Sequence, residues 1–506
     1  MAYCLYLPLD GRPCNARFPV ELAQLGAHTV RTPEVRLLGN AKQPANLRAL
    51  EHWLAAACEA SDPNEPLLLF LSLDTWLYGN LVASRKSTVS LEEVLGRLER
   101  LKALKTRYPH LQIYTLGTLL RLSNSNDDTE ERPYWASYGE KIYRYSWLEH
   151  ALSVNPDWET EALEFQRLSA DIPQDVLTDY RSLRQRNHAV LNAVIEGLKT
   201  QWITLCLLGC DDSGQYGWNV QEREHLHHHQ ASLPEQLFIY PGADELGSVL
   251  MARVLVPETY ACQVAWTHPE AQEQITRYEG IPLSATLEAQ AHAAGLTLQN
   301  TPQNNTQALL WIHNPPRDRV QVDQFLDRQT RWPLTASRYA SLNQYLQSPE
   351  SLPVLLADVF YANGGDAALL EHLEEQHALF ALQGYAAWNT TGNTLGYLLA
   401  WCKFYLKHGH ENPRLQRRLL MERLADDGLY QGHWRQAWCD HYTDPVTLNT
   451  CVQGIYTINQ RLKSWAEQYP EIAAMGQPQV KQLSFPWKRF FEVDLQICWP
   501  EGCSPA

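Results

Sequence analysis

Short apolar runs that end in a polar or acidic tip recur along the chain, and they restrict the fold more than any other feature. The runs YCLYLPLD (3–10), LLLFLSLD (67–74) and WITLCLLGCDD (202–212) contain almost no polar residue before their last positions. This near-continuous pattern is typical of strands that are buried on both faces of a parallel sheet. Similar runs occupy 111–118, 237–245, 308–314, 354–360 and 382–390, with weaker ones at 28–34 and 262–268.

Helical patterns separate these runs, for example at 90–108 and 176–200. Alternating strands and helices predict an α/β fold with mainly parallel sheets and flanking helices. Breaks near 255–260 and 405–412 divide the pattern, so we expect two α/β units plus a helical C-terminal part. The expected domains are an N-terminal parallel α/β domain (1–255), a smaller flavodoxin-like α/β domain (256–405) and a mostly helical region (406–506) that ends in a strand.

The charge and composition exclude several classes of protein. A formal net charge of −15 argues against nucleic-acid or anionic-membrane binding as the main role, because both need a basic surface. No segment approaches the roughly 20 apolar residues of a membrane span, and the N-terminus lacks the features of a signal peptide. Cys4, Cys206 and Cys262 lie in apolar runs, which predicts buried, reduced thiols and a cytoplasmic location. The sequence does not indicate an oligomeric state.

The tips of the runs carry the candidate functional residues, because ligands of α/β folds gather at the carboxyl ends of strands. A single acid at a strand end is explained equally well as a helix N-cap, but so many acidic tips predict a shared cleft in the first domain. These tips hold Asp10, Asp74, Asp211, Asp212, Asp244, Glu245, Asp358 and Asn389.

Asp211 and Asp212 are the strongest candidates, because two adjacent carboxyl groups follow a buried strand in LLGCDDSGQYGWN. Neighbouring carboxylates push each other's pKa values apart, which suits general acid/base catalysis on a glycosidic bond. Adjacent acids of this kind also occur in hexosaminidases that use the acetamido group of the substrate as nucleophile. The same pair is equally suited to a divalent cation, or to a turn and cap before the following helix.

Other residues are predicted to bind the substrate around this pair. Arg12 either forms a bidentate contact with a substrate anion or pairs with Asp10. Helix capping is the alternative role of Asp74 and of Asp244. Aromatic side chains are expected to stack on a ring of the substrate. The predicted substrate-binding residues are Asp10, Arg12, Asp74, Tyr78, Arg85, Tyr216, Asp244, Glu245, Asp358, Asn363 and Asn389, with Trp388 as a further stacking residue.

The sequence contains no motif for an organic cofactor. It has no GxGxxG or GxxxxGK[ST] loop, no HExxH and no GxSxG, which disfavours dinucleotide, Walker-type and serine or cysteine nucleophile sites. The histidine-rich HLHHHQ (225–230) reads better as a solvated helix face than as a metal site. We therefore predict no cofactor and no metal-ligand set, with a divalent cation as the alternative.

Several of these stretches together resemble an uncharacterised bacterial family, domain of unknown function 4127 (DUF4127). They are LPLDGRPCN, LSLDTWLYGNLVASR, LRLSNSNDDTEERPYWASYGEKIYRYS, LLGCDDSGQYGWNVQERE, PGADELGSVLMAR, DVFYANGGD, YAAWNTTGNTLG and FPWKRFFEVD. Asn80 departs from the glycine expected in the YGGL turn, and Gly11 stands where a serine is expected. The resemblance implies that the strand-tip motifs form one set, but it implies no catalytic roles.

Three functions follow from these observations. The first is a hydrolase that acts on a sugar-containing small molecule or oligosaccharide, with Asp211 and Asp212 as catalytic acid and base. The second is a metal-dependent hydrolase or transferase with Asp10, Asp74, Asp211 and Asp244 as ligands. The third is a non-catalytic, two-lobed protein that binds a small molecule.

Overall fold

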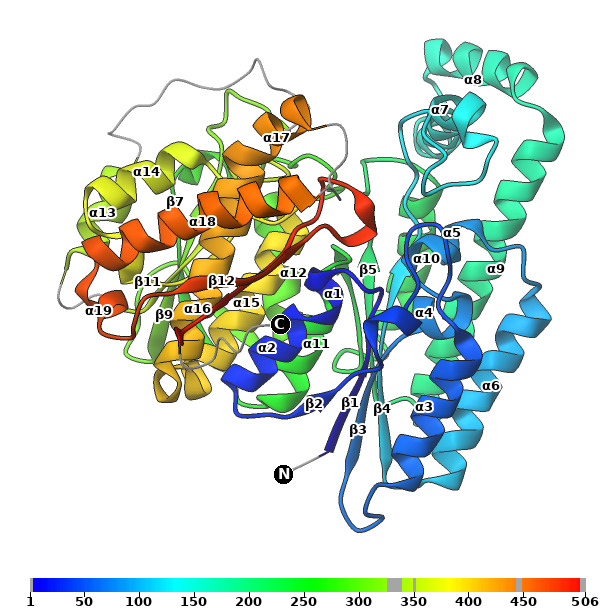
Figure 1. Ribbon diagram of the computed structural model, residues 1–506. Coiled ribbons are helices and arrows are strands. Elements are labelled where there is room, and N and C mark those ends of the chain that lie inside the picture. Colours follow the sequence, from blue (N-terminus) through cyan, green and yellow to red (C-terminus); the bar gives the residue numbers. More distant parts are fainter. Residues whose placement is uncertain (1–2, 325–338, 349–351, 443–447, 501–506) are drawn as a thin grey trace. The chain divides into compact units, whose positions relative to one another are not determined.

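The computed structural model describes residues 3–324, 339–348, 352–442 and 448–500. The chain folds into two compact units, and each contains its own parallel sheet flanked by helices (Figure 1). The predicted α/β class is therefore confirmed. Unit 1 comprises Met1–Gly11, His28–Leu250 and Tyr278–Ile281, and unit 2 comprises Arg12–Ala27, Met251–Arg277 and Pro282–Ala506.

The sheet of unit 1 has six parallel strands in the order β2-β1-β3-β4-β5-β6. In the central strand β3 all six residues are buried, as the unbroken apolar run LLLFLS requires. The chain leaves β1 toward one edge and β3 toward the other, so the topological switch point lies between the ends of β1 and β3. The strands are β1 (Tyr3–Leu7), β2 (Val30–Arg31), β3 (Leu67–Ser72), β4 (Leu111–Leu119), β5 (Leu205–Cys210) and β6 (Leu237–Pro241).

Helices of unit 1 form where apolar residues recur at helical spacing between caps. In α6 (Leu91–Arg107), Ser90 caps the N-terminus by accepting a hydrogen bond from the Glu93 amide at 3.2 Å, and Val94, Leu98 and Leu101 form the buried stripe. Figure 1 shows α3, α6 and α9 running alongside the sheet. The other helices with residues in unit 1 are η1 (Val35–Leu37), α3 (Leu47–Glu59), α4 (Leu73–Tyr78), α5 (Leu81–Lys86), α7 (Trp135–Val154), α8 (Glu159–Asp171), α9 (Gln174–Lys199), α10 (Trp218–Gln230) and α11 (Leu246–Leu255).

An aromatic core joins α7, α9 and α10 beyond the end of the sheet. Trp135 packs on Tyr180 with 4.8 Å between ring centroids, and Tyr180 lies 6.0 Å from Trp218. Trp218 is the first residue of α10, so this core fixes the end of the loop that follows β5. The loop that carries the two adjacent acids is thereby held between a buried strand and a buried helix start.

The sheet of unit 2 has five parallel strands in the order β11-β10-β9-β7-β8, the 2-1-3-4-5 order of doubly wound sheets. Its switch point lies between β7 and β9. The sequence analysis did not predict β8, a short edge strand with an exposed threonine. The strands are β7 (Tyr260–Trp266), β8 (Leu296–Gln299), β9 (Thr306–His313), β10 (Val354–Asp358) and β11 (Leu382–Ala386).

Helices cover this second sheet and continue into the C-terminal part of the chain. Two strands near the end of the chain, β12 (Gln479–Ser484) and β13 (Asp494–Cys498), form a small antiparallel sheet. β13 lies within the strand that was expected near residue 490. A π-helix (Leu424–Trp434) continues directly from α16. The helices are α1 (Pro13–Ala16), α2 (Phe18–Leu25), η2 (Pro269–Ala271), α12 (Leu283–Ala294), α13 (Ala340–Leu346), α14 (Ala367–Glu375), η4 (Leu379–Ala381), α15 (Thr391–His408), η5 (Gly409–Glu411), α16 (Pro413–Arg423), α17 (Arg435–His441), α18 (Leu448–Gln468), α19 (Pro470–Ala473) and η7 (Pro486–Lys488).

The sequence predicted that no segment spans a membrane and that the thiols are buried and reduced. Within the described ranges, none of the helices has both the length and the apolar character needed to cross a membrane. Cys4, Cys206 and Cys262 are buried and are not disulfide-bonded, whereas Cys498 is disulfide-bonded.

Candidate functional site

Asp74, the tip of β3, is buried and bonded to the next strand of the sheet. It is not the cap of α4, because Ser72 fills that position and accepts the Thr75 amide at 3.2 Å. The Asp74 carboxyl group instead accepts hydrogen bonds from the amide and the hydroxyl of Thr118, at 3.0 and 2.9 Å. Burial, with a smaller effect from nearby Asp211, raises the pKa of Asp74 to about 6.

Asp211, the first residue after β5, forms an ion pair with Arg85 of α5. The Arg85 side chain is buried, and its second terminal nitrogen lies 2.8 Å from the carboxylate of Glu130. A buried guanidinium is stable only when it is paired, so Arg85 and its two carboxylates depend on one another. The predicted residues Arg85 and Asp211 therefore meet directly, although 126 positions separate them.

Asp212 lies beside Asp211 but differs from it in backbone, partner and exposure. Its φ of 33° is in the left-handed region, which non-glycine residues seldom adopt. Its carboxyl oxygen lies 3.2 Å from Arg121, and its side chain is 30% exposed, against 11% for Asp211. Burial and the Asp211 charge raise the pKa of Asp212 to about 6, against the opposing effect of Arg121. Neither acid caps α10, whose N-cap position is Gly217.

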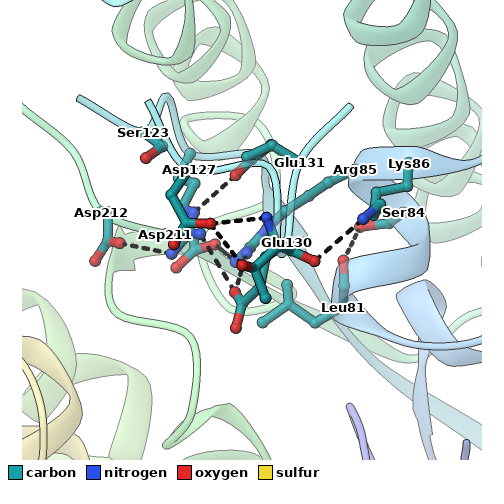
Figure 2. Close-up of polar contacts among 12 residues, drawn as sticks. Leu81, Ser84, Arg85, Lys86, Ser123, Asp127, Glu130, Glu131, Asp211 and Asp212 are labelled. Carbon is teal, nitrogen blue, oxygen red and sulfur yellow. Dashed lines mark hydrogen bonds and ion pairs between the residues drawn. The ribbon is translucent and has the colours of Figure 1, made fainter. Parts of the chain in front are cut away.

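Three further residues complete this group, and the sequence analysis did not single them out. Arg121 contacts Glu131 at 3.0 Å and Glu130 at 3.3 Å, in addition to Asp212. Figure 2 shows Glu130, Glu131 and Asp212 close together among the residues drawn. Glu131 is buried, burial raises its pKa, and its Oε2 has no hydrogen-bond partner in the part of the chain that the structure describes. Both glutamates come from the stretch SNSNDDTEE, which reads as an ordinary polar loop. Its place in one of the family-like stretches was the only signal for them.

We call these seven residues the acid–arginine cluster: Asp74, Arg85, Arg121, Glu130, Glu131, Asp211 and Asp212. Five carboxyl groups share two guanidinium groups, so the cluster has more acids than bases. The surplus explains why burial leaves several of these acids with raised pKa values. Such a site favours a cationic ligand or a reaction that develops positive charge.

Asp244 and Glu245 form a separate acidic pair at the tip of β6. The Glu245 carbonyl accepts the Val249 amide at the start of α11. The Glu245 carboxyl group is buried, and both of its oxygens lack a hydrogen-bond partner in the described structure. It lies against Gly242, whose φ is 131° and where a Cβ atom would stand 2.2 Å from Oε1. Burial, reinforced by Asp244 and Glu279, raises the pKa of Glu245 well above its usual range.

The remaining predicted residues of the first domain have varied environments. Asp10 is buried after β1, next to the switch point. Arg12 belongs to unit 2, where it lies 3.7 Å from Glu492 and over the Trp487 ring. The guanidinium group of Arg186 covers the ring of Tyr78. The buried hydroxyl of Tyr78 has no hydrogen-bond partner among the described residues.

Tyr216 lies on the loop after Asp212 and belongs to a group of aromatic side chains. Its ring meets Trp147 edge to face at 5.1 Å, His150 at 5.3 Å and Trp158 at 6.3 Å. Trp158 is 36% exposed, so this group has an accessible face. We call Trp147, Trp158 and Tyr216 the aromatic platform.

Asp358, Asn363 and Asn389 lie in unit 2. Asp358 ends β10 and accepts hydrogen bonds from the Asp366 amide at 2.6 Å and the Tyr385 hydroxyl at 3.0 Å. Burial, with a smaller effect from Asp366, raises its pKa to about 6. Asn363 and Asn389 both have positive φ values, and the Asn363 amide donates to the Asn389 carbonyl at 2.8 Å. Trp388 packs on Phe491 at 5.5 Å.

The described residues contain no group of three or more His, Cys, Asp or Glu side chains arranged to hold a metal ion. In the acid–arginine cluster, guanidinium groups occupy the positions between carboxylates that a cation would take. The HLHHHQ stretch lies on α10, where His225 is 6.0 Å from the ring of His188.

One comparison with known proteins identifies a family. The profile described as "Protein of unknown function (DUF4127)" matches residues 4–496, nearly the whole chain. No curated protein and no solved structure matches the chain.

Proposed function

The chain belongs to the DUF4127 family, and we propose that it is a hydrolase that acts on a sugar-containing small molecule or oligosaccharide. Asp212 would be the general acid that protonates the leaving oxygen. The observation that carries the proposal is the difference between two neighbouring acids, since Asp212 is accessible and has a raised pKa, whereas Asp211 is held against Arg85. Two carboxyl groups in unlike environments are the arrangement that glycoside hydrolysis uses.

The other members of the cluster support this chemistry through charge. Cleavage of a glycosidic bond passes through an oxocarbenium-like state that carries positive charge. A surplus of carboxylates over guanidinium groups stabilises such a charge more than it stabilises the neutral substrate. Asp211, fixed by Arg85, is suited to face the developing cation, and Asp74 adds a buried acid nearby.

The aromatic platform supports a sugar as the substrate. Tyr216 lies on the loop that follows the catalytic acid, and its ring contacts Trp147 of α7 and Trp158 at the start of α8. The apolar faces of a sugar ring pack on such side chains, while polar groups fix its orientation. We further propose a cytoplasmic enzyme that needs no organic cofactor and no nucleic-acid or membrane partner, in keeping with its acidic composition.

Hydrolysis of a panel of nitrophenyl glycosides and natural oligosaccharides, measured from pH 4 to 8, tests the proposal. We expect at least one sugar to be hydrolysed, with the activity lost in Asp212→Asn. Asp62→Asn, a change at an exposed turn acid outside the cluster, is the matched control and retains activity. Activity that persists in a folded Asp212→Asn protein contradicts the assignment.

The other two functions predict different results in the same assays. A metal-dependent hydrolase loses its activity with a chelator and regains it with Mg²⁺ or Mn²⁺. A binding protein shows calorimetric binding of a sugar without turnover, and that binding survives Asp212→Asn. Either result would replace acid catalysis by Asp212 as the explanation of the cluster.

A further inference from the structure

A threonine, a histidine and an aspartate form a continuous hydrogen-bonded chain in unit 2. The Thr267 hydroxyl lies 3.0 Å from Nδ1 of His313, and Nε2 of His313 lies 3.1 Å from Oδ2 of Asp366. The three residues come from the end of β7, the end of β9 and the N-cap of α14. A hydroxyl, a base and an orienting carboxylate in this order are the parts of a nucleophilic triad.

The surrounding contacts determine the direction of each hydrogen bond. The Asp366 carboxylate also accepts the Tyr339 hydroxyl at 2.8 Å, and an ionised carboxylate can only accept, so the Nε2 of His313 carries the proton. Nδ1 of a neutral imidazole is then an acceptor. The indole N–H of Trp311 donates to the Thr267 oxygen at 3.1 Å, which leaves the hydroxyl proton of Thr267 to point at Nδ1.

The imidazole is held in place and buried, whereas Thr267 is partly exposed. Phe360 stacks on the His313 ring at 4.8 Å with an interplanar angle of 11°, and the histidine is fully buried. Thr267 is only half-buried. Thr267 is therefore the member of the chain that has solvent-exposed surface.

The place of this chain in the fold also indicates a ligand site. Thr267 and His313 stand at the carboxyl ends of β7 and β9, which are the strands on either side of the switch point. Ligands of open α/β sheets bind in the crevice at that point. The sequence analysis discounted serine and cysteine nucleophiles for lack of a GxSxG motif, but it did not consider a threonine paired with a histidine 46 positions away.

We infer that Thr267 is an acyl-accepting nucleophile, with His313 as its general base and Asp366 as a positioning residue, in a second active site for carboxylic esters. The Thr267 oxygen forms a bond to the acyl carbon while its proton passes to Nδ1 of His313. The bond from the acyl carbon to the leaving alkoxide breaks, and the alkoxide takes that proton. Water then attacks the acyl carbon and gives a proton to Nδ1. The bond between the acyl carbon and the Thr267 oxygen breaks, that oxygen takes the proton from Nδ1, and the carboxylic acid leaves.

Acetylation by p-nitrophenyl acetate tests this inference on the full chain. We expect a burst of nitrophenolate and one acetyl group on Thr267, located by peptide mass spectrometry. Thr267→Val abolishes the burst and the label, whereas Thr267→Ser retains both. Thr297→Val, at an exposed threonine of the same sheet whose hydroxyl donates to the Tyr260 carbonyl, behaves as wild type. Nitrophenolate release that is the same in Thr267→Val, with no label on Thr267, overturns the inference.

The roles of the other two residues have separate readouts. His313→Gln is expected to slow acetylation of Thr267 by roughly 10²–10⁴-fold, and an unchanged rate in a folded variant overturns the inference. Asp366→Asn is expected to change the tautomer signature of the His313 ring nitrogens in NMR spectra as well as the rate. The acetyl label on Thr267 and the hydrolysis of glycosides are separate readouts, so failure here and failure of the proposed sugar hydrolase are distinguishable.

Discussion

Arg85 and Arg121 both contact the same carboxylate oxygen, Oε2 of Glu130, at 2.8 and 3.3 Å. Through that oxygen the ion pair of Arg85 with Asp211 is linked to the ion pair of Arg121 with Asp212. The two adjacent acids at the end of β5 are therefore the two ends of one series of ion pairs, which runs through Arg85, Glu130 and Arg121. Figure 2 shows both acids and Glu130. A turn and a helix cap do not explain them.

Removal of Arg85 is expected to destabilise the protein strongly. Arg85→Ala leaves Asp211 and Glu130 without a buried partner, and breaking a buried pair in this way costs about 3–5 kcal/mol. Urea unfolding of unit 1 measures the change. Arg36→Ala, which breaks the exposed pair with Glu34, is the control and is expected to change the free energy of unfolding little. Arg85→Met combined with Asp211→Asn removes both charges, so it should cost less than Arg85→Ala alone; an equal or larger loss contradicts the argument.

The raised pKa of Asp74 predicts that stability falls as pH rises. The folded state holds the Asp74 proton up to a pH of about 6, whereas the unfolded chain releases it near 3.8. The contribution is therefore complete below pH 4 and is lost as pH rises through about 6. A shift of this size corresponds to about 3 kcal/mol.

Asp74→Asn should remove this part of the pH dependence. The free energy of unfolding, measured between pH 4 and 7, is expected to fall less steeply in Asp74→Asn than in wild type. Asp62→Asn, at an exposed turn, should follow the wild-type curve. Parallel curves for wild type and Asp74→Asn would show that the Asp74 pKa is ordinary.

Glu245 should make the protein less stable at neutral pH than a glutamine in its place. Among the described residues, both oxygens of its buried carboxyl group lack a hydrogen-bond partner, and burial raises its pKa, so the folded state keeps this group protonated. The unfolded chain ionises it above pH 4.5, and wild type loses about 1.4 kcal/mol per pH unit relative to Glu245→Gln until the raised pKa is reached. Unfolding at pH 5 and pH 8 measures the difference. Glu65→Gln, an exposed change, is the control, and a Glu245→Gln protein that gains nothing at pH 8 refutes the prediction.

The strands were predicted well because each apolar residue of a run indicates that its own position is buried. The run LLLFLS became β3, and the acids at the run ends became the tips of the sheet. Contacts between residues far apart in the sequence determine which strand ends lie together. No local sequence pattern predicts those contacts. Arg121 and Glu130 sit in unremarkable polar sequence, yet they join Asp211 to Asp212.

Local departures from the family pattern were equally uninformative without the backbone. Asn80 stands where a glycine was expected, but its φ of 175° is extended backbone that any residue adopts. Its side chain caps α5 by accepting the Ala83 amide at 2.8 Å, and it donates to the carbonyl of Asn40. The departure therefore supplies a helix cap and a loop contact.

The proposed acid role of Asp212 predicts a specific pH profile. A general acid must be protonated, so kcat/KM should fall above a pH of about 6, the pKa of Asp212. Asp212→Asn should lower kcat by roughly 10²–10⁴-fold and remove this limb. Asp211→Asn removes the neighbouring charge that raises the pKa of Asp212, so the limb should move to lower pH. A limb that stays in place in Asp211→Asn contradicts the coupling of the two acids.

The aromatic platform predicts a change in substrate binding without a change in chemistry. Tyr216→Ala removes the ring that meets Trp147 and Trp158, and an aromatic contact is worth about 0.5–1.5 kcal/mol. KM should therefore rise roughly two- to tenfold while kcat changes little, because the ring binds substrate and transition state alike. Tyr216→Phe keeps the ring and loses only the hydroxyl that accepts Asn155 Nδ2 at 3.3 Å, so its KM should stay near wild type. Steady-state kinetics on the best sugar from the panel separates these outcomes, and an equal effect of both substitutions would assign the contribution to the hydroxyl instead of the ring.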